Sequence, residues 1–122
     1  MPYAIYKVLH LLGAFGLFTA LGALCVQALS GAPAAERARR RSLSILHGVG
    51  AVLLLVSGFG MLATLGLSGA MPGWAWAKVA LWLVLGAVVM LPVRRPRSAR
   101  WLLWILPLLG ALAAWLAIDK PF

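Results

Sequence analysis

Residues 3–29 read YAIYKVLHLLGAFGLFTALGALCVQAL, a stretch long and apolar enough to cross a lipid bilayer as one helix. Three further runs of this kind follow at residues 43–67, 74–93 and 101–118. An α-helix rises about 1.5 Å per residue and spans the hydrocarbon in about 20 residues. The connections are too short to fold outside the membrane. The sequence therefore predicts an all-α membrane protein, a single four-helix up-down bundle over residues 1–122.

Composition and charge support this class. Hydrophobic residues make up 64% of the chain and charged residues 11%, which excludes an ordinary soluble domain. The net charge of +9 does not indicate a nucleic-acid partner, because eight of the eleven basic residues are arginines in two short loops, 30–42 and 94–100. By the positive-inside rule we expect both loops in the cytoplasm of a bacterium, with the two termini and the Ser68–Gly73 turn on the periplasmic side of its inner membrane.

Two features of the first run need an interpretation. It is longer than the core of a signal peptide and lacks a strongly charged start, so we expect it to remain as a helix. Cys25, the only cysteine, excludes an intramolecular disulfide and is expected to pack as a small hydrophobic residue.

Small residues recur at helical spacing in three of the runs, which predicts close approach between helices. Pro107 interrupts the last run and is expected to allow a kink there. The stripes comprise Gly13, Gly16, Ala20 and Ala23 in the first run, Gly50, Ser57, Gly60 and Ala63 in the second, and Gly110, Ala111, Ala114 and Ala117 in the last.

Two histidines, His10 and His47, lie on the small-residue sides and should face protein. Each is either a neutral imidazole satisfied by a hydroxyl, carbonyl or water, or a functional group. In the predicted threading His10 lies near the outer side and His47 near the inner side, about 20 Å apart in depth. This separation excludes a haem held by both rings of one chain, whereas a haem held by His10 alone, or by His10 of two copies, stays possible.

The same depth estimate groups Lys7, His10 and Lys78 in the outer third of the membrane, with Tyr6 one helical turn before His10. We predict a cofactor-binding site at these four residues for haem b, a quinone or a lipid headgroup, because all can donate hydrogen bonds to carbonyl or anionic oxygens. His10 is the candidate single haem ligand. His47 is a separate and weaker candidate.

Tryptophans flank Lys78 and mark the ends of the runs. Trp74 and Trp82 lie four residues before and after Lys78, which suggests a cation–π contact, although the long lysine side chain can equally snorkel to the headgroups. We interpret Trp74 and Trp76 at the outer boundary, and Trp101 and Trp104 at the inner one, as interfacial anchors.

Three segments carry a family resemblance: Leu9-His10-Leu11; Ile45-Leu46-His47 followed by Leu53-Leu54-Leu55-Val56-Ser57-Gly58; and Trp76-Ala77-Lys78 followed by Leu85-Gly86. They resemble the small SirB-like membrane family over three of the four runs, and more loosely the CopD-type copper-resistance domain and HemJ-type protoporphyrinogen oxidases. The resemblance implies a bundle of membrane helices and, through the HemJ type, haem b at the positions of His10 and Lys78.

The chain also departs from these families. Gly48, Val49 and Gly50 stand where the SirB pattern has an acidic residue after the second histidine, and the longer loops and additional span of the HemJ type are missing.

Polar chemistry inside the runs restricts the function. A proton-coupled small transporter needs a carboxylate in the membrane, whereas the only acids are Glu36 in the arginine-rich loop and Asp119 at the chain end. The histidines and Cys25 do not assemble a transported-metal site, and no nucleophile, base and orienting group occur together, so an enzyme is not expected.

Two interpretations remain. The first is an accessory or structural subunit that packs against other membrane subunits or a second copy through its small-residue stripes. The alternative is a redox-associated protein that holds haem b or a quinone near the outer face. The sequence favours the first, because the chain is small and has no domain outside the membrane.

The predicted threading can be tested by labelling. Tags at the two chain ends should both react with a membrane-impermeant reagent added to the periplasmic side, because an even number of spans returns the chain to its starting side. Termini on opposite sides would contradict the four-span topology.

Overall fold

The computed structural model describes residues 2–31 and 37–122, with the side chains of residues 37 and 38 excepted. The rest of the first arginine-rich loop, including Glu36, lies outside the described residues. The elements are α1 (Tyr3–Leu29), α2 (Arg37–Thr64), α3 (Gly73–Ala87), α4 (Met90–Arg94), a short 3-10 helix η2 (Pro96–Ser98) and α5 (Ala99–Asp119). The described residues form no strand, which confirms the all-α class.

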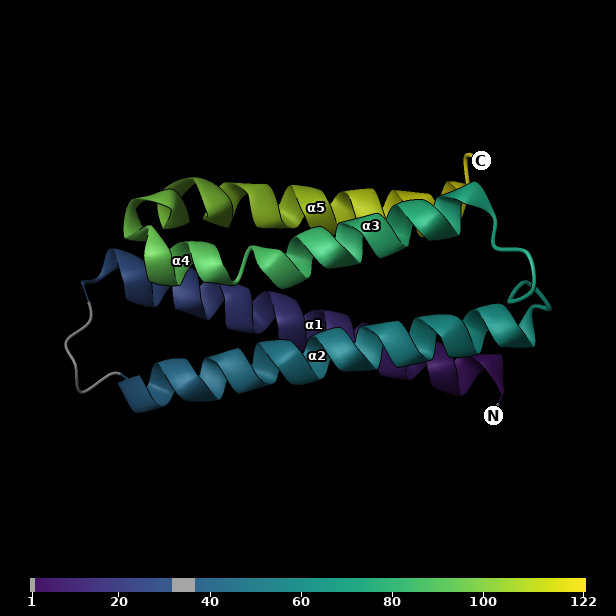
Figure 1. Cartoon of the computed structure of the whole chain (residues 1–122), viewed down its shortest axis with the longest axis horizontal. Coiled ribbons are helices and arrows are strands. Elements are labelled where there is room, and N and C mark those ends of the chain that lie inside the picture. The colour runs from purple at the N-terminus through teal and green to yellow at the C-terminus, as the bar shows by residue number, and fades with distance from the viewer. Residues whose placement is uncertain (1, 32–36) are drawn as a thin grey trace.

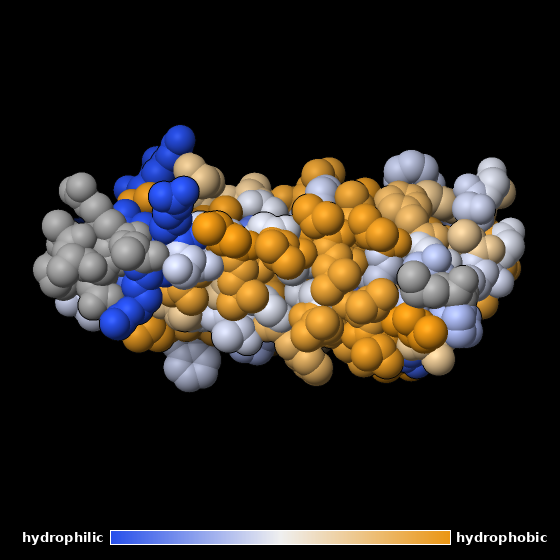
Figure 2. Space-filling model, turned by 90° about the horizontal axis from the view of Figure 1, so that it is seen from below, coloured by the Kyte–Doolittle hydropathy of each residue, from blue (hydrophilic) through white to orange (hydrophobic). Residues whose placement is uncertain are grey.

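Four helical segments are long and apolar enough to cross a membrane: Tyr3–Leu29, Arg39–Thr64, Gly73–Arg94 and Pro96–Asp119. They run up and down as two hairpins lying side by side, with both termini at one end (Figure 1). We call this the terminal end, and the opposite one the arginine end. Figure 2 shows hydrophilic residues gathered at the arginine end and hydrophobic ones across the middle of the face. The protein is therefore a small multi-pass membrane protein whose apolar helices contact lipid.

Helix α2 differs from its predicted bounds, 43–67, at both ends. It begins at Arg37, because arginine is a good helix former and the basic loop joins the helix. It ends at Thr64 because Gly66 adopts a left-handed conformation (φ 73°). The Leu67 N–H then donates to the Leu62 carbonyl at 2.9 Å and the Gly66 N–H to the Ala63 carbonyl at 3.1 Å, a Schellman motif.

The third span is broken, although the sequence predicted one helix over 74–93. Helix α3 ends at Ala87, and α4 begins at Met90. Pro92 has no N–H to donate to the Val88 carbonyl, which accepts from the Leu91 N–H at 3.0 Å instead. Pro107, by contrast, lies inside a continuous α5.

Helices α1 and α2 pack most extensively, and their contact is centred on two glycines. A Cβ atom on Gly50 would lie 2.7 Å from the Gly13 carbonyl oxygen and 2.9 Å from the Leu17 nitrogen. A Cβ on Gly13 would lie 2.9 Å from the Gly50 carbonyl oxygen. Only glycine permits this approach of two backbones, as the small-residue stripes predicted.

The buried core lies toward the arginine end and draws on all four spans. Cys25 is fully buried in it, as expected for a small hydrophobic residue. Its members are Leu17, Leu21, Cys25, Ala51, Leu81, Leu85, Ala99, Leu102 and Leu106.

The glycine contact predicts a position-specific stability loss. Gly50→Ala should lower the free energy of unfolding by about 1–3 kcal/mol, because the methyl group must push two backbones apart. The unfolding midpoint in a fixed detergent measures this.

Gly48→Ala is the matched control, since a Cβ there meets nothing within 4 Å. It should be neutral or slightly stabilising through better helix propensity. Equal midpoints for the two variants would contradict the close contact.

Candidate functional site

A pocket of about 390 Å³ lies between the helices in the half of the bundle next to the terminal end. We call it the terminal-end pocket. Its walls are mostly apolar, and its polar groups come from a few side chains. The polar and aromatic members of the lining are Tyr3, Lys7, His10, Phe18, Phe59, Trp74, Lys78, Trp82 and Lys120.

The α5 wall of this pocket consists of small residues and Ile118. Gly110, Ala113, Ala114 and Ala117 all line it. The sequence predicted a close-packing surface at Gly110, Ala111, Ala114 and Ala117. Gly110 does lie against Phe18, since a Cβ there would be 3.6 Å from its ring, but Gly110, Ala114 and Ala117 also line the cavity. Over their whole length, α3 and α5 pack less extensively against α1 and α2 than α1 and α2 pack against each other, which leaves room for a cavity.

His10 is held in one tautomer by its hydrogen bonds. Its Nδ1 lies 3.1 Å from the Leu54 carbonyl oxygen and 3.1 Å from Ser57 Oγ. A carbonyl can only accept, so Nδ1 carries the proton and donates. The Ser57 hydroxyl itself donates to the Leu53 carbonyl, which leaves its oxygen free to accept from His10.

This arrangement leaves the Nε2 lone pair of His10 for another partner. No described residue forms a hydrogen bond with Nε2. Every fully buried polar side-chain atom of the described residues has a hydrogen-bond partner, so Nε2, which has none, must be accessible. His10 lines the terminal-end pocket, and its ring packs against Gly58. A neutral imidazole with one nitrogen fixed by a carbonyl and the other free is the usual state of a metal-ligating or hydrogen-bond-accepting histidine.

All three lysines of the chain line the same pocket, whereas every arginine belongs to the segments at the arginine end. Lys78 is half-buried on α3, and Lys7 is exposed on α1. No carboxylate is among the described residues that line it. The pocket therefore combines apolar walls with positive charge and suits a ligand that carries carbonyl or anionic oxygens.

Lys120 was missed by sequence reasoning. It follows the end of α5 in a left-handed conformation (φ 47°), and its Nζ lies 5.4 Å from the ring centre of Trp74. The cation–π partner of Trp74 is thus Lys120, where the sequence suggested Lys78. An up-down bundle brings the C-terminus to the same end as Lys7, His10 and Lys78, and this could have placed Lys120 near the site.

Tyr6 does not line the pocket. A Cβ on Gly60 would collide with the Tyr6 ring, so this phenol fills the space that the glycine leaves on α2. Tyr3, one turn earlier, lines the pocket instead. Tyr3 and not Tyr6 lines the pocket because the Gly13–Gly50 contact sets the rotation of α1 against α2.

His47 lies apart from this pocket. It is 5% exposed, and its Nε2 donates to the Leu85 carbonyl at 3.0 Å. Leu85 belongs to the last turn of α3, where the carbonyl groups have no backbone N–H from a following helical turn to accept from. Trp82 Nε1 adds a second bond between these helices, to the Ala51 carbonyl at 2.8 Å. The structure therefore gives His47 a partner at the helix break.

The separation of the histidines is smaller than the sequence estimate of about 20 Å. Ser57, a partner of His10, lies ten residues beyond His47 on α2, which corresponds to about 15 Å of helix. His47 is nevertheless engaged elsewhere and does not line the pocket. Among the described residues no group of three or more His, Cys, Asp or Glu side chains could hold a metal ion.

Comparison with known protein families, with curated proteins and with solved structures gives no match for this chain. The resemblance to the SirB-like family stays a prediction.

The role of His47 at the helix break can be tested by its replacement. His47→Ala should lower the free energy of unfolding by about 1–3 kcal/mol, because it leaves the Leu85 carbonyl unpaired in a buried site. His47→Gln keeps an N–H donor on a side chain of similar reach and should recover most of the loss. Unfolding midpoints in one detergent check this, and equal losses in both variants would argue against the hydrogen bond.

Proposed function

We propose that the protein binds a membrane redox cofactor, a quinone or haem b, in the terminal-end pocket. The observation that carries this proposal is that His10 lines an apolar pocket with its Nδ1–H held by the Leu54 carbonyl, which leaves Nε2 without a partner among the described residues.

The imidazole supplies an acceptor that needs no rearrangement on binding. With Nδ1 protonated, Nε2 can accept a hydrogen bond from a quinol hydroxyl or ligate a single haem iron. Ser57, 1% exposed, also accepts from Nδ1 and so fixes the ring further. Such support from behind a ligating ring is the usual arrangement in metal and cofactor sites.

The lysines supply donors that complement this acceptor. Lys78 can donate to a quinone carbonyl or a haem propionate, and Lys7 and Lys120 bring further positive charge to the same end. One ligand in this pocket can therefore meet the lone pair of His10 and the positive charges of three lysines, Lys7, Lys78 and Lys120.

The size of the pocket and the family resemblance favour different cofactors. Its volume of about 390 Å³ is toward the lower end of the range of ligand pockets, about 300–1,000 Å³, and favours the quinone ring. The resemblance to HemJ-type proteins favours haem b. When bound, either group would supply electron-transfer chemistry, and the residues of this chain would hold and orient it.

The proposed orientation in the membrane follows from the separation of the arginines from the lysines. We propose that the arginine end faces the cytoplasm of a bacterium and the terminal-end pocket opens near the periplasmic face of the inner membrane. A membrane-dissolved quinone reaches such a pocket without crossing water.

The proposal predicts that His10→Ala and Lys78→Ala each lower the cofactor content of the purified protein, by about tenfold for the loss of one hydrogen bond to a charged or ligating group. The measurements are the visible absorption spectrum for haem and solvent extraction with chromatography for quinone. His47→Gln, which keeps the bundle and lies outside the pocket, is the control and should retain wild-type content.

Unchanged content in both His10→Ala and Lys78→Ala would remove the proposal. A wild-type protein with no haem band and no extractable quinone that co-purifies with other membrane subunits would instead support the accessory-subunit interpretation.

A further inference from the structure

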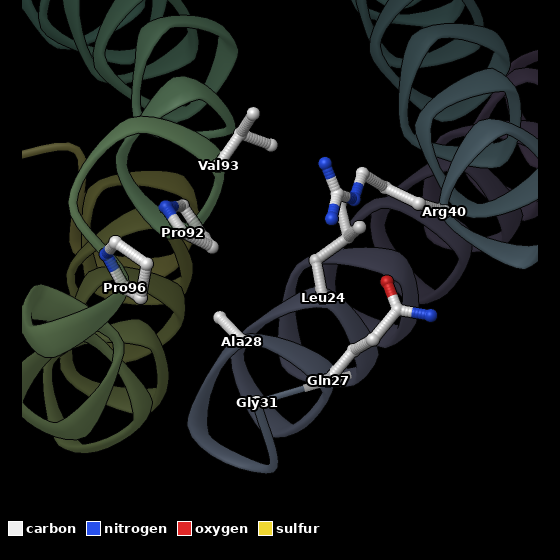
Figure 3. Close-up of a pocket in the computed structure, with 8 residues that line it drawn as sticks. All are labelled: Leu24, Gln27, Ala28, Gly31, Arg40, Pro92, Val93 and Pro96. Atoms are coloured by element: carbon white, nitrogen blue, oxygen red, sulfur yellow. The ribbon is translucent and has the colours of Figure 1, made fainter. Parts of the chain in front are cut away.

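A second, smaller pocket lies at the arginine end and has no part in the cofactor proposal. It encloses about 130 Å³ between the end of α1, the start of α2 and the α4–η2 segment. Figure 3 shows the Arg40 guanidinium reaching from α2 toward Leu24, while the Gln27 side chain extends from α1 on the α2 side. We call it the Arg40 pocket. Its lining consists of Leu24, Gln27, Ala28, Gly31, Arg40, Pro92, Val93 and Pro96.

Arg40 differs from the other arginines in its burial. Among the arginine side chains that the structure describes, Arg40 alone is half-buried, while the rest are exposed: Arg39, Arg41, Arg94, Arg95, Arg97 and Arg100. No carboxylate is among the lining residues that the structure describes. A guanidinium is always charged, and its partial removal from water is unfavourable unless an anion accepts its hydrogen bonds.

Apart from Gln27, the side chains around this cation are apolar, and they lie at a membrane boundary. Leu24 and Ala28 belong to the last turns of the first span, and Pro92 and Val93 to the end of the third. Proline lacks an N–H, so Pro92 and Pro96 add no donors. The site therefore suits a molecule that has an anionic group joined to an apolar part at the same depth.

The break in the third span forms this pocket. Because the helix stops at Ala87 and restarts at Met90, α4 and η2 turn against the end of α1 and supply the second wall. An uninterrupted helix over 74–93 would have no such turn. Pro92 thus both ends the regular hydrogen bonding and faces the cavity.

We propose that the Arg40 pocket binds the phosphodiester of an anionic phospholipid. Arg40 would bind the phosphate oxygens through its planar fork of N–H groups, while the glycerol and first acyl carbons lie against Leu24, Ala28 and Val93. The exposed arginines around the pocket favour a headgroup of net negative charge over a zwitterionic one. Lipids of the surrounding leaflet are the source.

The test uses the purified full chain in detergent, titrated with phosphatidylglycerol or with phosphatidylcholine and examined by native mass spectrometry. We expect wild-type protein to retain phosphatidylglycerol in preference to phosphatidylcholine. Arg40→Gln should weaken phosphatidylglycerol binding by about tenfold, the usual effect of losing one charge-assisted contact. Arg41→Gln removes the same charge from an exposed neighbouring position and should change binding by less than about twofold.

A second variant tests the cavity independently of the charge. Ala28→Trp fills the pocket with Arg40 retained and should weaken binding as much as Arg40→Gln does. Circular dichroism checks that both variants keep wild-type helix content, and the cofactor content of the terminal-end pocket should be unchanged in both.

Four results would overturn the proposal: equal losses in Arg40→Gln and Arg41→Gln, which would indicate only a diffuse positive field; wild-type binding in Ala28→Trp; equal retention of the two lipids; or displacement of the lipid by millimolar inorganic phosphate, which would indicate a site for the free anion.

Discussion

The backbone contact between Gly13 and Gly50 is the constraint on which the bundle depends. It holds α1 and α2 closer than any pair of larger side chains allows, and so fixes their register and rotation. One turn before Gly13, His10 then meets the Leu54 carbonyl and Ser57. One turn before His10, Tyr6 packs against Gly60. The tautomer of His10, and with it the free Nε2, is a consequence of how two glycines pack.

The two halves of the bundle differ because their side chains differ in size. Toward the arginine end, leucines from α1, α3 and α5 meet around Cys25 and fill the interior. Toward the terminal end, α5 presents Gly110 and three alanines to the same interior, and the space stays open. Packing at one end supplies the stability, since a bundle in lipid is held mainly by van der Waals contact and hydrogen bonds. The open half is thereby available for a ligand.

The two histidines show how the same side chain acquires different roles from its surroundings. Both rings donate to a helix carbonyl, His10 through Nδ1 to Leu54 and His47 through Nε2 to Leu85. The His47 bond supports the point where Pro92 interrupts the third span, and the ring is sealed in the bundle. The His10 bond leaves Nε2 without a partner among the described residues, and His10 lines a pocket. The direction in which each ring projects, and not the residue type, separates a packing role from a candidate binding role.

The sequence by itself determined the class, the number of spans and the end at which each charge lies. Apolar length and the segregation of three lysines from eight arginines suffice for these, because transfer of a charge or a bare peptide group into hydrocarbon is too costly to allow alternatives. It also placed Lys7, His10 and Lys78 at one depth, since depth follows from counting residues along straight helices, and all three line the terminal-end pocket. Only the tertiary structure decided that Tyr3 and not Tyr6 faces the pocket, that Lys120 covers Trp74, that the alanines of α5 line a cavity and that Arg40 turns inward. These depend on the rotation of each helix about its own axis and on the break before Pro92. Both are set by contacts between helices distant in sequence, which no periodicity within a single span records.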